Sequence, residues 1–242
     1  MTPKFPGFPA AGIDFLKGLE ENNNREWFQE RKPIFDSAVK APMMELIEAF
    51  NGHLAELAPK YVTPAAKSLY RIYRDTRFSK DKTPYKNHIA ALFPHQNLPK
   101  NACAGFFFSI AANSIEFAAG LYSPEPDQLI AVRHYIAENH KELRKLINNS
   151  TLQKLMGPMK GDQLTRPPKG FPSDHPAADL VRHKQWVFYT SGTIDPRLAT
   201  SPKLLSEFVV RTKALAPFVD FFNRPLVPMH RKKESTRVML EI

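Results

Sequence analysis

Apolar residues recur every three or four positions between residues 35 and 57. This spacing places them on one face of a helix that packs against a protein core. Pro33 and Pro42 interrupt the segment, and proline lacks the N–H that a helix interior requires. We therefore expect a kink or two consecutive helices, which end before Pro59. The apolar positions are Phe35, Ala38, Val39, Met43, Leu46, Ile47, Phe50, Leu54 and Leu57.

A shorter helix is predicted before this segment, from Ile13 to Leu19, and it ends near the three asparagines at 22–24. Asn24 is a suitable N-cap for the next helix, because its side chain can accept a hydrogen bond from a backbone amide of the first turn. Trp27 and Phe28 lie in the early turns of that helix. We expect both rings, together with the apolar face that follows, to be buried against strands within 104–121.

The pattern changes to that of strands after residue 68, with β-branched and aromatic runs bounded by turn residues. The predicted strands are 69–73, 88–93, 105–112, 114–122 and 185–193. The third and fourth meet at Asn113, which predicts a hairpin. The arginines at 71, 74 and 77 also have helical spacing, but the local composition favours a strand that leads into a loop.

The rest of the chain is mainly helical. Ser123-Pro124-Glu125-Pro126-Asp127 is typical of a helix start, and Ser201-Pro202 opens a last long helix. Helices followed by strands and again by helices indicate an α+β fold, with one domain over 1–242 and a mainly antiparallel central sheet packed by long helices. Its expected parts are a helical N-terminal part (1–59), a basic loop with strands (60–122), and helices with a further strand (123–242).

Composition narrows the class of protein. A single cysteine, Cys103, excludes an internal disulfide framework and thiolate-rich metal sites. There is no secretory signal and no apolar run near the ~20 residues that span a bilayer, so we expect a cytoplasmic protein with no membrane association. The net charge of +10 permits nucleic acid or nucleotides as partners.

This charge is concentrated in one segment. Residues 60–86 hold eight Lys or Arg and two acidic residues. Residues 71–86, which we call the basic loop, interleave six of these cations with Tyr73, Phe78 and Tyr85. Arginine forks bind planar oxyanions and aromatic faces stack on bases, so we predict that the loop binds a phosphate-bearing small molecule or nucleic acid. The candidate binding residues are Arg71, Arg74, Arg77, Lys80, Lys82 and Tyr85.

A structural explanation of the same loop is also open. Asp75 and Asp81 would pair with neighbouring arginines and order the loop, and we expect Asp75 to accept hydrogen bonds from Arg71 or Arg77. Two acidic residues cannot neutralise six cations, so some positive charge should remain available. A third possibility is a protein–protein interaction module that uses the loop against an acidic partner.

Catalysis is the alternative to binding. A phosphoester hydrolase needs an acid/base or metal group, and the weak candidates are Asp75, Asp81, His88, Asp174 and His175. Simpler roles exist for several of them: Ser173 or Asp174 would cap a helix that starts at Pro176, and His88 would be a structural histidine. No metal site is predicted from linear spacing.

Sequence motifs identify no cofactor. The chain lacks the phosphate loop Gly-x-x-x-x-Gly-Lys-Ser/Thr and the dinucleotide fingerprint Gly-x-Gly-x-x-Gly. It also lacks His-Glu-x-x-His, Cys-x-x-Cys and Gly-x-Ser-x-Gly. Any phosphate contact must therefore come from side chains. The oligomeric state is left open.

The basic loop also carries a family resemblance. Arg71, Arg74-Asp75, Arg77-Phe78, Asp81-Lys82 and Tyr85 form a pattern that resembles the bacterial family of domain of unknown function 2461. The resemblance continues in Phe15-Leu16, Asn22-Asn23, Trp27-Phe28, Gly120 to Pro126, Pro168 to Pro172 and Asp174 to Pro176. That family has no established activity, so the resemblance implies no mechanism.

Overall fold

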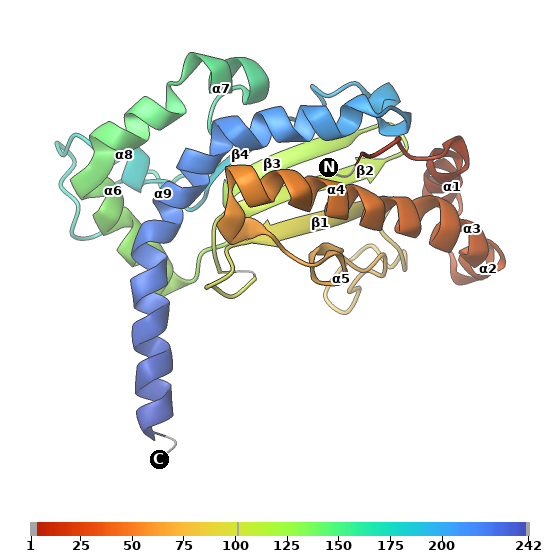
Figure 1. Ribbon diagram of the computed structural model, residues 1–242. Helices are drawn as coiled ribbons and strands as arrows, with labels where there is room; N and C mark the ends of the chain where they lie inside the picture. Colours follow the sequence, from red (N-terminus) through yellow and green to blue (C-terminus); the bar gives the residue numbers. More distant parts are fainter. Residues whose placement is uncertain (1–3, 101, 241–242) are drawn as a thin grey trace. The chain divides into compact units, whose positions relative to one another are not determined.

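A computed structural model describes residues 4–100 and 102–240, with side chains as far as Arg231. Its backbone forms a four-stranded antiparallel sheet in the order β1-β2-β3-β4 (Figure 1). The strands are β1 (His88–Pro94), β2 (Gly105–Ala111), β3 (Ile115–Leu121) and β4 (Trp186–Tyr189). The helices are α1 (Ala10–Glu21), α2 (Arg25–Glu30), α3 (Lys32–Ile34), η1 (Phe35–Lys40), α4 (Ala41–Leu57), η2 (Pro59–Tyr61), α5 (Ala65–Ser68), α6 (Pro126–Ile147), α7 (Ser150–Met156), α8 (Ala178–Val181), η3 (Pro196–Thr200) and α9 (Lys203–Leu240).

The α+β class and the antiparallel sheet that the sequence predicts are confirmed. Backbone contacts group the described residues into two compact units. The first draws on Met1–Phe93, Phe107–Phe117 and Thr190–Val210. The second draws on Pro94–Phe106, Ala118–Tyr189 and Arg211–Ile242. The single-domain organisation and its segment boundaries at residues 59 and 122 stay predictions.

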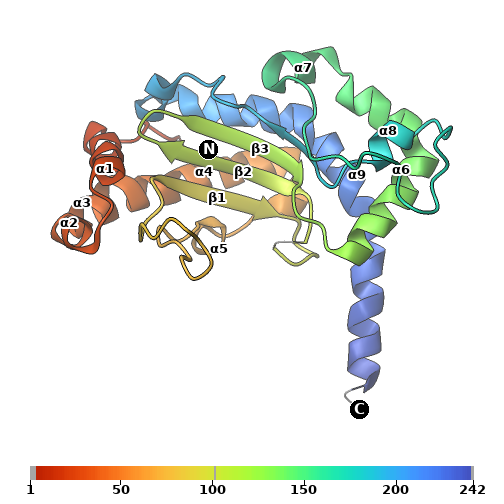
Figure 2. The same ribbon diagram turned by 180° about the vertical axis from the view of Figure 1, so that it is seen from behind.

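The core of the first unit is an aromatic cluster between α4 and the strands. The α4 helix runs along the face of β1 and β2 (Figures 1 and 2). Phe50 of α4 is fully buried, with its ring 4.8 Å from Phe93 and 5.5 Å from Phe108. Phe208, in the first turns of α9, stacks on Phe108 at 4.6 Å. The apolar positions predicted for this face are buried from Phe35 to Leu54, whereas Leu57 is half-buried.

The segment predicted as a kinked helix or two consecutive helices forms three successive elements, α3, η1 and α4, with Pro33 in the first turn of α3 and Pro42 in the first turn of α4. Residues Phe35–Lys40 adopt the wider π geometry, in which the amide of Ala41 donates to the carbonyl of Asp36 five residues earlier. Pro42 has no N–H to donate to the carbonyl of Ala38, so the regular ladder cannot continue across this point. Gly12 of α1 lies against that carbonyl, and a Cβ at Gly12 would come within 2.1 Å of the Ala38 oxygen.

The predicted packing of the first aromatic residues is partly wrong. Phe35 is buried, but its ring contacts Phe15 at 5.8 Å and Phe28 at 5.3 Å, within the N-terminal helices. Trp27 is only half-buried, at 5.2 Å from Phe15. Phe35 and Trp27 thus pack on Phe15 of α1.

The second unit has its own core. Trp186 of β4 stacks on Phe222 of α9 at 5.4 Å, and Phe188 contacts Phe218 at 4.9 Å. The predicted start of α6 is confirmed: Glu125 and Gln128 form a reciprocal capping box ahead of Pro126. None of the helices in the described part of the chain has the length and apolar character required to span a bilayer.

Two local predictions do not hold. The segment 69–73 is extended but makes only the isolated bridges Leu69↔Ala91 and Tyr73↔Tyr85, so it is not a regular strand. The expected cap by Ser173 or Asp174 is wrong, because α8 begins at Ala178 with Ala177 at the N-cap and no side-chain cap. The predicted strand within 185–193 is present and is limited to β4.

Candidate functional site

The basic loop is held at its base by backbone pairing. The first residues of the loop run antiparallel to its last residues through the bridge Tyr73↔Tyr85, and Leu69, just before the loop, bridges to Ala91 of β1. The amide of Arg74 donates to the carbonyl of Pro84 at 2.9 Å, and the amide of Lys86 donates to the carbonyl of Ile72 at 2.8 Å. The intervening residues 75–83 therefore form a closed excursion at the end of a short two-stranded ribbon.

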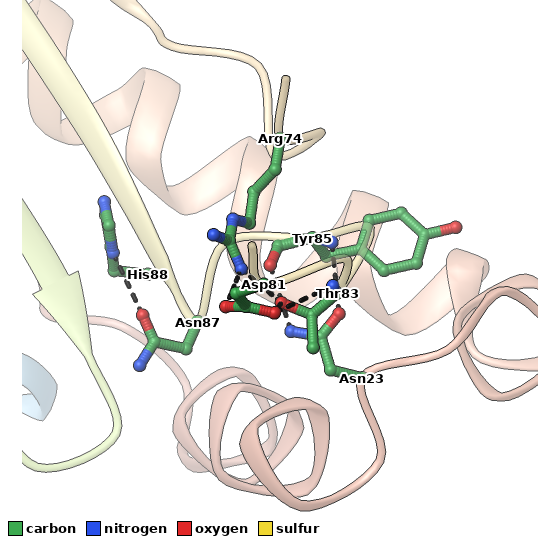
Figure 3. Close-up of polar contacts among 7 residues, drawn as sticks. All are labelled: Asn23, Arg74, Asp81, Thr83, Tyr85, Asn87 and His88. Atoms are coloured by element: carbon green, nitrogen blue, oxygen red, sulfur yellow. Dashed lines mark hydrogen bonds and ion pairs between the residues drawn. The ribbon is translucent and has the colours of Figure 1, made fainter. Parts of the chain in front are cut away.

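Asn23 attaches this ribbon to the N-terminal helices (Figure 3). Its side-chain amide donates to the carbonyl of Tyr85 at 3.0 Å, and its oxygen accepts from the amide of Tyr85 at 3.1 Å. The next residue, Asn24, caps α2 as predicted, with its oxygen 2.9 Å from the amide of Trp27. The turn between α1 and α2 thus orients both α2 and the basic loop.

Tyr85 forms a wall of the site. Its ring is stacked on Phe28 at 4.0 Å with an interplanar angle of 15°, and the residue is 2% exposed. Burial raises the pKa of the Tyr85 hydroxyl above its ordinary value. Tyr73 packs beside it, with ring centroids 5.3 Å apart, and stays 46% exposed. The partly exposed ring of Tyr73 therefore packs against the buried ring of Tyr85.

Asp75 pairs with Arg77, as the sequence predicts. The carboxylate accepts from Nε at 3.0 Å and from an Nη atom at 2.8 Å, and also from the Arg77 amide at 3.2 Å. These bonds lower the pKa of Asp75 to about 2. Asp195 and Arg197 form the same pairing outside the basic loop, at the start of η3. The Asp-x-Arg pair is therefore a local structural feature and does not by itself indicate a ligand site.

Asp81 closes the loop from the other side (Figure 3). Its carboxylate accepts from the amide and the hydroxyl of Thr83, at 2.9 and 2.8 Å, and forms an ion pair with Arg74. The hydrogen bond from the Thr83 amide, and next the one from Arg74, lower the pKa of Asp81 to about 2. Lys82 donates to the carbonyl of Thr76 at 2.8 Å and so links the two arms of the loop.

A cleft of about 780 Å³ opens between the basic loop and the start of α2. Its positive charges are Arg25, Arg74 and Lys82, and none of the described residues that line it is Asp, Glu or His. The lining is Asn23, Asn24, Arg25, Gln29, Tyr73, Arg74, Thr76, Lys82, Thr83, Pro84 and Tyr85. Aromatic, amide and cationic groups thus surround one concave space.

The predicted binding residues divide into two groups. Arg74, Lys82 and Tyr85 line the cleft. Arg71, Arg77 and Lys80 are exposed on the loop and are not part of this lining. Within the described part of the chain, Lys80 has no hydrogen-bond or ion-pair partner, whereas Arg77 is engaged by Asp75.

Sequence reasoning missed the α2 side of the cleft, which contributes Asn23, Asn24, Arg25 and Gln29. One signal was available. Arg25 is the first residue of α2, where the helix dipole favours acidic side chains over cations. A cation in that position is unfavourable for the helix alone and therefore points to another role.

The candidate catalytic residues do not form an evident centre. His88 is half-buried at the start of β1, with Nδ1 3.1 Å from the side-chain oxygen of Asn87, and burial lowers its pKa (Figure 3). Asp174 is exposed in the second unit, and Nδ1 of His175 accepts from the amide of Ala177 at 3.1 Å. In the ranges that the structure describes, no three His, Cys, Asp or Glu residues gather closely enough to hold a metal ion.

The sequence matches one known protein family over most of its length. Residues 11–221 match the model of the family described as conserved hypothetical protein (DUF2461). The chain belongs to this family. The match includes the Asn23 turn, α2 and the whole basic loop, so every residue that lines the cleft falls within it. No curated protein and no solved structure matches the chain.

Proposed function

We propose that this DUF2461 protein is a cytoplasmic binding protein whose cleft takes a phosphate-bearing ligand of nucleotide size. The observation that carries the proposal is the lining itself: Arg25, Arg74 and Lys82 face one concave space without a carboxylate among them. Arginine and lysine side chains form strong charge-assisted hydrogen bonds with phosphate oxygens. Tyr73 supplies a partly exposed ring for a planar group, and the amides of Asn23, Asn24 and Gln29 supply donors and acceptors.

The ion pairs within the loop leave an excess of positive charge. Asp75 and Asp81 are each engaged by one arginine of the loop, Arg77 and Arg74. Arg25 and Lys82, which both line the cleft, lie outside these pairs. An anion that enters the cleft therefore meets cations that the loop's own acidic residues do not neutralise. Positive charge in a concave site also concentrates anionic ligands before contact.

The shape of the site favours a small ligand over the alternatives. A volume of about 780 Å³ is within the range of roughly 300–1,000 Å³ for small-molecule sites. A protein partner would be better served by a broad exposed patch. Hydrolysis would require a general base within reach of the ligand. Asp81, whose partners Arg74 and Thr83 line the cleft, is engaged by both of them. These features support binding without turnover.

The test is a calorimetric titration of the protein with inorganic phosphate, AMP and ATP at two salt concentrations. Affinity should fall as salt rises, because exposed charges are screened. Arg25→Ala removes one charged contact, worth roughly 1.5–3 kcal/mol, and should weaken binding about ten- to a hundredfold. Among the described residues Arg25 makes no hydrogen bond or ion pair, so the fold should be preserved.

Arg197→Ala is the matched control. It removes the same charge from an arginine that is 90% exposed and pairs with Asp195 away from the cleft, so it should bind like the parent. Equal loss in both variants would show that only net charge matters. Absence of binding to all three ligands, or unchanged affinity in a folded Arg25→Ala variant, would refute the proposed site.

A further inference from the structure

Phe78 is the most exposed large apolar residue among those described. It lies in the middle of the basic loop and is 94% exposed, and the guanidinium of Arg77 lies 5.6 Å from the centre of its ring. Exposing a whole phenyl ring to water contributes nothing to folding. The charge pairing of Asp75 and Asp81 orders the loop without any contribution from this ring. The position of Phe78 is therefore not explained by the fold.

Phe78 closely follows a cleft residue in the chain. Thr76 and Lys82 both line the cleft and are joined by the hydrogen bond from the lysine ammonium to the threonine carbonyl. Phe78 is two residues beyond Thr76, so their Cα atoms are at most about 7.6 Å apart. A strand that leaves the cleft along this arm of the loop can therefore reach Phe78, which has Arg77 and Lys80 near it in sequence.

We infer that the natural ligand is single-stranded nucleic acid, with one nucleotide in the cleft and the neighbouring base stacked on Phe78. The inference rests on the proposed function and names the substrate class of the same site. Proteins that bind single strands combine a positively charged groove with aromatic side chains on which bases stack. Here Arg25, Arg74 and Lys82 provide the charge and Phe78 provides the platform.

An anionic membrane is the other surface that attracts an exposed ring with cations nearby. The lining of the cleft favours nucleic acid. The polar cleft at the base of the loop presents amides, which suit the edges of bases but would gain nothing from acyl chains.

The experiment measures fluorescence anisotropy of labelled single-stranded oligonucleotides with the full-length protein and four variants. Phe78→Ala should weaken binding about five- to 150-fold, the range for removing one base-stacking side chain. Phe78→Leu keeps the apolar character but removes the ring, so it should lose as much affinity as Phe78→Ala. Phe78→Trp keeps a stacking surface and should bind like the parent. Tyr122→Ala removes another aromatic side chain, which is 73% exposed and lies outside the loop, and should change nothing.

Each remaining outcome separates this inference from the proposed function. If AMP binds but oligonucleotides bind no more tightly, or if the Phe78 variants bind oligonucleotides like the parent, the inference is wrong and the cleft proposal stands. If Phe78→Leu binds like the parent and the protein sediments with phosphatidylserine vesicles, the partner is a membrane. Loss of affinity in Tyr122→Ala would show that the contacts are not those of the loop. If neither AMP nor oligonucleotide binds, both proposals fail.

Discussion

Asn23→Ala should loosen the attachment of the basic loop to the N-terminal helices without unfolding the protein. The Asn23 side chain makes two hydrogen bonds to the backbone of Tyr85, across 62 residues of sequence. The stacking of Phe28 on the Tyr85 ring remains in this variant. Removal leaves the Tyr85 amide and carbonyl without these partners in a partly buried place.

The expected cost follows from the two bonds. Each contributes about 0.5–1.5 kcal/mol net, so the free energy of unfolding should fall by about 1–3 kcal/mol. Chemical denaturation measures this change. Amide hydrogen exchange locates it: exchange should quicken at Tyr85, and also at Arg74 and Lys86, whose amides complete the ribbon. Because Asn23 lines the cleft, affinity for AMP should fall as well.

Asn22→Ala is the matched control. Asn22 directly precedes Asn23, and its side-chain amide donates to the carbonyl of Gly18 at 3.0 Å in an exposed hydrogen bond. It should lose less stability and leave exchange in the loop unchanged. If the two alanine variants have the same stability and the same exchange at Tyr85, the loop does not depend on Asn23 and this reasoning is wrong.

Three further predictions concern the rest of the fold. Phe35→Ala should lower the free energy of unfolding by roughly 3–5 kcal/mol, since it empties a buried aromatic site; a variant that melts like the parent would contradict the packing. Gly12→Ala should destabilise by about 1–3 kcal/mol despite the better helix propensity of alanine, because its Cβ would overlap the Ala38 carbonyl; a more stable variant would contradict this. Burial lowers the pKa of His183, so the unfolded chain binds the proton more readily and stability should fall as pH drops below about 6.5. His183→Gln should flatten that dependence in denaturation curves measured across pH.

The features predicted correctly are those set by neighbours in sequence. The apolar spacing of α4, the proline and acidic start of α6 and the β2–β3 hairpin each depend on a few adjacent residues. The Asp75–Arg77 pair is likewise local, with one residue between the partners. The π-helix was missed because Pro42 indicates only that the regular hydrogen-bond ladder is interrupted, and not which geometry replaces it.

The cleft shows the same limit more clearly. The sequence displayed the charges of the basic loop, but the number of lysines and arginines did not show which of them share a concave surface. That depends on the Asn23 contact to Tyr85 and on the stacking of Phe28 against the same residue. Arg25 therefore joins the site only when the turn between α1 and α2 is placed beside the loop. Long-range contacts of this kind leave no periodic signal.

Two features of the site are unfavourable for the fold taken alone. Arg25 puts a cation at the start of α2, where an acidic residue would interact better with the helix dipole, and Phe78 exposes nearly its whole ring to water. Local rules are most often broken at functional positions, because selection there acts on binding rather than on stability. The Asp-x-Arg pairs, in contrast, are satisfied and occur both inside and outside the loop. The residues that best mark the site are therefore Arg25 and Phe78, and not the arginines that the loop itself neutralises.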